Sequence, residues 1–165
     1  MRLRGLARQL DKPLGRGRIW RVTATDQPYE PFTRDLAMLD APQLIELLSD
    51  TNGWVRDTSQ RLLVVHAGRG VDRQLARIAL TGAPVAAVHA LWTLEGRGAL
   101  SRRTVRAALA RGEEDVRRAA LRAGLSVLRR KDLLTLAASG PPAALAQEAT
   151  LALARHNSHA SVQPY

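Results

Sequence analysis

The histidines are the side chains with most scope for chemistry, because the sequence contains 4 of them and no cysteine. His66 and His89 lie on two predicted helices, but no further ligands are spaced to complete a metal site around them. We expect each to pack or to cap a helix. His156 and His159 share a polar tail and indicate at most a weak, adventitious metal site. The sequence therefore predicts no metal site and no cofactor.

Carboxylates and hydroxyls are not arranged for catalysis either. The acidic side chains at 113–115 are adjacent, so they point in different directions and do not converge on one substrate. They fit the start of a helix, where the macrodipole favours negative charge. Thr58, Ser59 and Ser101 have no histidine and acid at the spacing that activates a nucleophile. We expect no catalytic residue, and the chain is not predicted to be an enzyme.

The composition favours closely packed helices. Of the 165 residues, 45% are apolar and only 4% aromatic. Alanine and leucine dominate the apolar set, and both form helices well and strands poorly. No apolar run reaches about 18 residues, so no membrane-spanning segment is predicted. The basic start at 1–4 is not followed by an apolar run, so no signal peptide is predicted.

Positive charge is concentrated near the start of the chain. The net charge is +10, and residues 1–21 hold six Arg and one Lys against one Asp, a net +6. Residues 22–165 hold 18 basic against 14 acidic side chains, a net +4. A basic segment of this kind attracts any polyanion and does not by itself indicate a specific nucleic-acid reader.

Residues 1–40 are predicted to form a basic arm. Within it, residues 18–23 alternate apolar and polar side chains between glycines, which is typical of a strand. No partner strand is predicted, so this strand is isolated and indicates a piece of a larger protein. Residues 24–40 contain Pro28 and Pro31 and read as a linker.

Helical patterns begin at Asp40, which can cap the first turn together with Gln43, and continue to residue 155. The helices form pairs, and the second helices superpose at offsets of 31, 30 and 29 residues. The corresponding apolar positions are Val55, Ala86, Val116 and Leu145. Four residues after each stands a small side chain, which lets helices approach closely: Ser59, Ala90, Ala120 and Ala149.

A pair of helices cannot bury its apolar face alone, so successive pairs must stack. The predicted fold is all-α, a right-handed α-solenoid of about four helix pairs over residues 41–155. The isolated strand and linker precede it, and a polar tail at 156–165 follows it.

Two apolar faces are expected to form the inner packing. The helix at 54–66 presents Val55, Leu62 and Val65 on one stripe, and the helix opened by Pro84 presents Val85, Val88, Leu91 and Trp92. A buried tryptophan brings a large apolar area to an alanine-rich core. The residues predicted to pack between repeats are Trp54, Val55, Trp92 and Val116. For the two tryptophans the alternative is an exposed recognition surface.

The pairs Val55-Arg56 and Asp115-Val116-Arg117, each with a small residue four positions after the valine, resemble HEAT repeats. The resemblance covers residues 41–155. Ala86 and Leu145 replace the valine in the other two units, and no arginine follows them. HEAT repeats imply a scaffold that binds other proteins.

A narrower resemblance rests on Gly17-Arg18-Ile19-Trp20-Arg21-Val22, Asn52-Gly53-Trp54-Val55-Arg56-Asp57-Thr58 and His89-Ala90-Leu91-Trp92-Thr93-Leu94-Glu95-Gly96. In this order and spacing they are similar to the membrane-bound-dehydrogenase-like proteins of planctomycete bacteria. In that family a six-bladed, sugar-dehydrogenase-like β-propeller precedes HEAT repeats and often a c-type cytochrome domain.

The resemblance implies that residues 16–23 match the end of the propeller and residues 41–155 the HEAT segment. It implies a protein partner, for which a propeller dehydrogenase domain is one candidate. The family that the chain resembles is mostly exported. The family's catalytic and haem-binding residues have no counterpart in this chain, which contains neither a propeller nor a cysteine.

The arginines are the remaining candidates for a site. Arg56 and Arg117 occupy one position of the second helices and are expected to form a structural ladder between repeats, paired with Asp57, Asp115 or helix-end carbonyls of a neighbouring repeat. The alternative is a row that grips phosphates. Further arginines cluster in the third unit and are the best candidates for an anionic partner: Arg102, Arg103, Arg106, Arg118 and Arg122.

Three functions are compatible with these residues. The favoured one is a non-catalytic HEAT-repeat scaffold that binds protein, a fragment or shortened relative of the region after a propeller. The alternative is a nucleic-acid-binding HEAT-like protein that uses an arginine-rich face, in the manner of HEAT-like DNA glycosylases. A maturation or lyase-type HEAT protein that acts on a cofactor protein has only the fold in its favour.

Overall fold

The computed structural model describes residues 33–68 and 70–160, with side chains to residue 155. This part of the chain is helical throughout, which confirms the predicted all-α class. The α-helices are α2 (Ala41–Glu46), α3 (Gly53–His66), α4 (Val71–Thr81), α5 (Pro84–Gly96), α6 (Arg102–Leu109), α7 (Glu114–Ala123), α8 (Arg130–Ala138) and α9 (Ala143–Ala160). Three short 3₁₀ helices accompany them: η1 (Leu36–Met38), η2 (Leu47–Ser49) and η3 (Gly124–Ser126). The strand predicted at 18–23 lies outside the described residues.

Side-chain caps fix where several helices begin. Asp40 accepts a hydrogen bond from the Gln43 amide at 2.9 Å, and Gln43 Oε1 accepts from the Asp40 amide at 3.0 Å, which is the predicted capping box. Asn52 caps α3 through the Trp54 amide. Ser101 caps α6 through the Thr104 amide. These caps satisfy amides that have no partner within their own helix.

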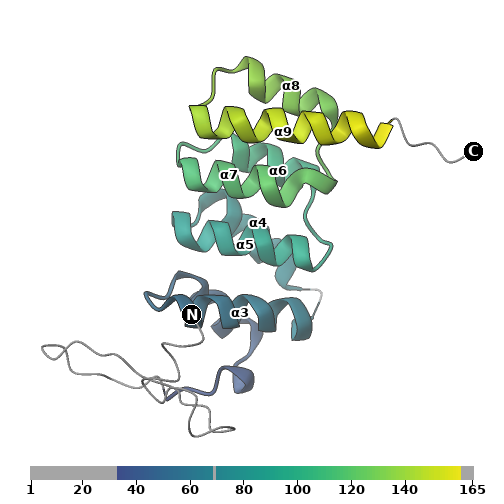
Figure 1. The fold of residues 1–165 in the computed structure, drawn as a ribbon. Helices are drawn as coiled ribbons and strands as arrows, with labels where there is room; N and C mark the ends of the chain where they lie inside the picture. The colour runs from purple at the N-terminus through teal and green to yellow at the C-terminus, as the bar shows by residue number, and fades with distance from the viewer. Residues whose placement is uncertain (1–32, 69, 161–165) are drawn as a thin grey trace, which may run out of the picture. The chain divides into compact units, whose positions relative to one another are not determined.

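The helices pack as neighbours in two layers (Figure 1). α3, α5, α7 and α9 contact one another in succession, and α2, α4 and α6 do so behind them. Each helix of the first layer also packs on the helix before it, as α9 does on α8. The four small side chains predicted to allow close approach are all fully buried: Ser59, Ala90, Ala120 and Ala149.

The buried faces of α3 and α5 differ from the predicted stripes. α3 buries Val55, Ser59 and Leu63, whereas Val65 is 66% exposed. α5 buries its alanines together with Leu91, Thr93 and Leu94, and Val85 is 48% exposed. The reason is that α5 packs against α3, α4 and α7 at once, so several of its faces are buried. The face that carries Val85, Val88 and Trp92 lies at the edge of these contacts and remains partly open to solvent.

Two further predictions are corrected at the surface. Trp54 is 60% exposed instead of packed between repeats, because it lies one position before the buried Val55 in the first turn of α3. The last helix, α9, continues to Ala160, so the tail predicted at 156–165 begins as helix.

Gly124 at the end of α7 tests how closely the layers are packed. A Cβ atom built there would lie 2.9 Å from Val105 Cγ2 and closer still to Val105 Cγ1. Val105 is fully buried and, being β-branched, has little freedom to rotate away. Gly124→Ala should therefore lower the free energy of unfolding by about 1–3 kcal/mol. Gly112→Ala is the control, since nothing lies within 4 Å of its Cβ position. Equal urea midpoints for the two variants would contradict this packing.

Candidate functional site

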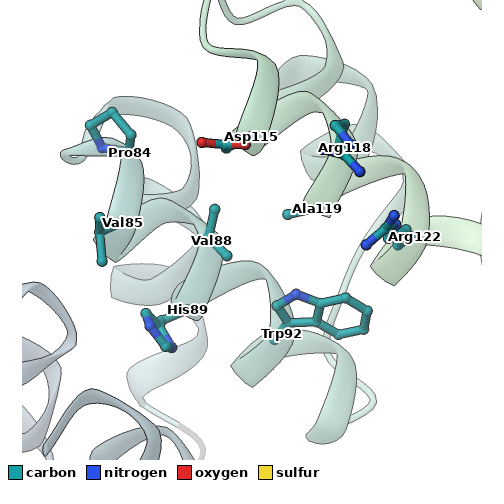
Figure 2. A pocket seen from close by; sticks show the side chains of 9 residues that line it. All are labelled: Pro84, Val85, Val88, His89, Trp92, Asp115, Arg118, Ala119 and Arg122. Atoms are coloured by element: carbon teal, nitrogen blue, oxygen red, sulfur yellow. The ribbon is translucent and has the colours of Figure 1, made fainter. Parts of the chain in front are cut away.

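A groove of about 340 Å³ runs between α5 and α7 and is the strongest candidate for a site (Figure 2). We call it the α5–α7 groove. Its lining residues are Pro84, Val85, Val88, His89, Trp92, Asp115, Arg118, Ala119 and Arg122. Val85, Val88 and Trp92 lie on one face of α5, and this face forms the apolar wall of the groove.

The apolar wall is partly open to solvent. Val85 is 48% exposed, and Val88 and Trp92 are half-buried. Trp92 was predicted to pack between repeats, and it does contact the core, but one side of it borders the groove. Val55 and Val116, predicted for the same packing, are fully buried and take no part in this surface.

Charged side chains border the groove on the α7 side. Asp115, in the first turn of α7, lies toward Pro84, whereas Arg122 lies toward Trp92 (Figure 2). The two ends of the groove therefore carry opposite charges. Arg118 stands between them on the same helix face.

Glu148 of α9 holds the two arginines in place. It accepts from Arg118 Nε at 3.1 Å and from Arg122 Nε at 3.0 Å, with a further bond from Arg122 Nη2. Burial pushes the pKa of Glu148 up, but hydrogen bonds from Arg122 and Arg118 outweigh this and bring the pKa below its ordinary value. The carboxylate therefore stays ionised at neutral pH, and both guanidinium groups keep a fixed position.

His89 links the groove to α3. Its Nδ1 lies 2.8 Å from Gln60 Oε1, and its Nε2 accepts from Arg56 Nε at 3.2 Å. Nε2 must be unprotonated to accept, so Nδ1 carries the proton and donates to Gln60. Burial lowers the pKa of His89; Asp57 opposes this and Arg56 adds to it. The imidazole is therefore neutral at pH 7 and serves as a packed, hydrogen-bonded side chain, as the sequence predicted.

The predicted ladder of Arg56 and Arg117 between repeats is not formed as expected. Arg56 donates to the carbonyls of Asp50 at 2.7 Å and Thr51 at 3.1 Å, which precede α3 in its own helix pair, and its bond to the next pair is the one to His89. Arg117 makes no such bond within the described residues, and its Nε is buried without a partner. The two positions match in sequence, but they do not share a role.

The structure shows a different arginine in the linking role, Arg97, which sequence reasoning missed. It donates to the carbonyls of Leu63, Ala67 and Gly68 at 2.8, 2.9 and 3.0 Å, and to Asp72 at 2.6 Å. Its side chain is only 9% exposed. These carbonyls lie at the carboxyl end of α3, which carries negative partial charge and attracts a cation. Arg97 therefore joins α5 to the helix pair before it.

Arg111 does the same one helix pair later. It donates to the carbonyls of Ala79 at 3.1 Å and Gly82 at 2.9 Å at the end of α4, and to Glu113 at 2.6 Å. The hydrogen bond lowers the pKa of Glu113. One local signal in the sequence could have indicated these two arginines: Arg97 and Arg111 each adjoin a glycine near a helix end.

The arginine cluster predicted in the third unit is divided between two layers. Arg102 binds Asp132 of α8 through two hydrogen bonds of 2.7 and 2.8 Å, and Arg106 lies 3.6 Å from the same carboxylate. Arg103 is exposed, and no ion pair is seen for it in the described part of the chain. These three lie on α6, whereas Arg118 lies on α7, so they do not form one basic face.

In the ranges whose side chains are described, 33–68 and 70–155, no three His, Asp or Glu side chains gather where they could hold a metal ion. His66 is exposed at the end of α3. None of the helices described is both long and apolar enough to cross a membrane.

Removing Arg97 tests the link between helix pairs. Arg97→Ala leaves Asp72 and three helix-end carbonyls without their donor, so the free energy of unfolding should fall by about 2–4 kcal/mol. Arg97→Lys should recover only part of the loss, because an ammonium lacks the planar fork. Arg103→Ala, at an exposed position, should change stability by less than about 0.5 kcal/mol. Urea unfolding followed by circular dichroism measures all three, and a harmless Arg97→Ala would exclude this role.

Asp132 should shape the stability of the protein in acid. Its hydrogen bonds with Arg102 lower its pKa from 3.8 to about 2. A lowered folded-state pKa contributes stability that is complete above pH 3.8 and is lost as the pH falls toward 2. In Asp132→Asn, the decline of urea midpoints over this range should be shallower than in the wild type. Glu114→Gln, at an exposed position, is the control. Parallel profiles for the wild type and Asp132→Asn would contradict the assignment.

Comparison with known proteins adds no relative. No family model matches the chain, and neither a curated protein nor a solved structure shows a significant match. The resemblances to HEAT repeats and to the propeller dehydrogenases therefore stay predictions from the residues. The function has to be inferred from the α5–α7 groove itself.

Proposed function

We propose that this chain is a HEAT-type α-solenoid that acts as a non-catalytic scaffold and binds protein through the α5–α7 groove. The observation that carries the proposal is the groove itself, where half-exposed Val88 and Trp92 lie beside two arginines held by Glu148. Tryptophan and arginine are the residues most enriched at the energetic centres of protein interfaces.

The recurrence of buried positions supports the repeat assignment. Val55, Val116 and Leu145 are fully buried and Ala86 nearly so, at the spacing of about 30 residues found in the sequence. Arg97 and Arg111 each span about one such spacing, with sequence separations from 25 to 34. Stacked helix pairs of this kind expose a continuous layer of second helices, which repeat proteins use for binding.

The chemistry of the groove favours binding over catalysis. Both ring nitrogens of His89 are engaged, by Gln60 and by Arg56, so the imidazole is not available as a general base. Asp115 lies toward the opposite end from Arg122. The lining contains no hydroxyl side chain. The groove therefore offers an apolar surface bordered by the charges of Asp115, Arg118 and Arg122, which suits the binding of a ligand and not its chemical conversion.

The contacts of the arginines favour a protein partner over nucleic acid. Arg97, Arg102 and Arg111 are bonded to carboxylates and carbonyls of the protein itself. Their side chains are 9%, 26% and 11% exposed, so they offer little surface to a phosphate backbone. The resemblance to a segment that follows a propeller adds a propeller domain to the candidate protein partners.

A photo-reactive amino acid in the groove tests the proposal. With p-benzoylphenylalanine at position 85, irradiation of the cells that naturally produce the chain should yield discrete protein adducts. The matched control is position 134, where Leu134 of α8 is 42% exposed against 48% for Val85. Adducts at both positions or at neither would contradict the proposal. Tight binding of labelled duplex DNA at about 50 mM salt, lost at about 200 mM, would favour the nucleic-acid alternative instead.

A further inference from the structure

We propose that the α5–α7 groove binds a linear segment of a partner protein in which a bulky apolar side chain lies next to a carboxylate. The apolar side chain packs between Val88 and Trp92 of α5 and Ala119 of α7, and the carboxylate is bound by Arg118 and Arg122. This inference rests on the proposed function and gives its partner a chemical class.

The guanidinium groups have donors to spare. Each arginine carries five N–H donors in a planar fork. Glu148 accepts one hydrogen bond from Arg118 and two from Arg122, and neither guanidinium makes a further hydrogen bond within the described part of the chain. Several donors on each arginine therefore remain for a second carboxylate, which planar guanidinium groups bind in paired fashion.

The charge that faces the solvent is positive. The side chain of Glu148 is 16% exposed, whereas those of Arg118 and Arg122 are 35% and 55% exposed. Two cations thus share one anion, and the anion lies deepest. Because Glu148 already fixes both side chains, a ligand carboxylate meets donors whose ordering costs little further entropy.

The size of the groove suits side chains and not a folded surface. At about 340 Å³ it lies at the small end of the roughly 300–1,000 Å³ range of ligand sites. Ala119 is almost fully buried, and its short side chain lies across the groove from Val88 (Figure 2), which leaves space beside Val88 and Trp92. One or two apolar side chains of an extended or helical segment fill such a space.

The opposite end of the groove sets a direction. Asp115 is exposed and lies toward Pro84, at the far end from Trp92 (Figure 2). A segment with its carboxylate at the Arg122 end and a neutral or basic residue at the Asp115 end matches both charges. A polyphosphate chain that followed the groove would meet Asp115 at this end, and the negative charge would repel it.

Selection from a display library of random 12-residue peptides against the full chain tests the inference. The selected peptides should combine Leu, Ile, Phe or Trp with an Asp or Glu close by. A labelled synthetic peptide from this set should lose about tenfold in affinity by fluorescence anisotropy when Arg122 is changed to Ala. Replacing the peptide's own Asp by Asn should cost about as much, and the two changes together should cost less than their product.

Control variants separate binding from folding. Arg122→Ala leaves Arg118 on Glu148, and Val85→Asp alters an exposed position, so both should keep the wild-type helical signal. Val85→Asp should weaken binding, because it puts a hydrated charge on the apolar wall of the groove, and that charge would lose water when a ligand covers it. Arg103→Ala on α6 and Leu134→Asp on α8 are the matched changes outside the groove and should leave the affinity unchanged.

The outcomes distinguish this inference from the proposed function. Selected peptides that bind equally to wild type, Arg122→Ala and Val85→Asp would overturn the inference and leave a protein-binding scaffold. Selected peptides rich in Lys and Arg, or competition by labelled single-stranded DNA, would overturn the charge assignment. If no peptide is selected but the adducts at position 85 persist, the linear segment is refuted and the protein-binding scaffold stands. If neither peptides nor adducts are obtained, both the inference and the proposed function are overturned.

Discussion

The close approach of α5 to its three neighbours is the constraint on which the rest of the structure depends. α5 contacts α3, α4 and α7, and Ala87 and Ala90 at these contacts are fully buried. Alanine contributes little apolar area for each residue, so stability must come from the density of contact. The neighbouring helices bury the faces of α5 that carry its alanines, Leu91 and Leu94. Val85, Val88 and Trp92 lie on the remaining face, so the groove is a consequence of how the helices are arranged.

Arginine supplies the links that an alanine-rich core lacks. Arg97 and Arg111 bind the carboxyl ends of α3 and α4, where several carbonyls have no partner within their own helix. Gly98, with a φ of 65°, ends α5 immediately after Arg97 and lets the chain turn away. Much of the positive charge of the helical region is thus used inside the protein. The excess of arginine over lysine has a structural use here, since one planar fork bonds several carbonyls at once.

The sequence carried enough information for the helices, the cap at Asp40 and the recurrence of small residues. It did not predict which face of α5 is buried, because apolar residues lie all round this helix and the positions of α3, α4 and α7 decide which of them are covered. It also missed Arg97 and Arg111, whose partners lie about 30 residues earlier. The groove could not be predicted either, because Trp92 and Arg122 are distant in the sequence and line one groove only because α5 and α7 are adjacent.

Glu148 shows how one residue can serve stability and recognition together. Its ion pairs with Arg118 and Arg122 tie α9 to α7, and they also hold those guanidinium groups at the rim of the groove. Since its pKa is lowered, the carboxylate stays ionised to a lower pH than an ordinary glutamate, and the ion pairs weaken only in more acid solution. A ligand carboxylate would add a second anion to a cluster of two cations and one anion. Binding would then complete the charge balance of the α7–α9 contact, so a ligand of this class should also stabilise the carboxyl-terminal helices.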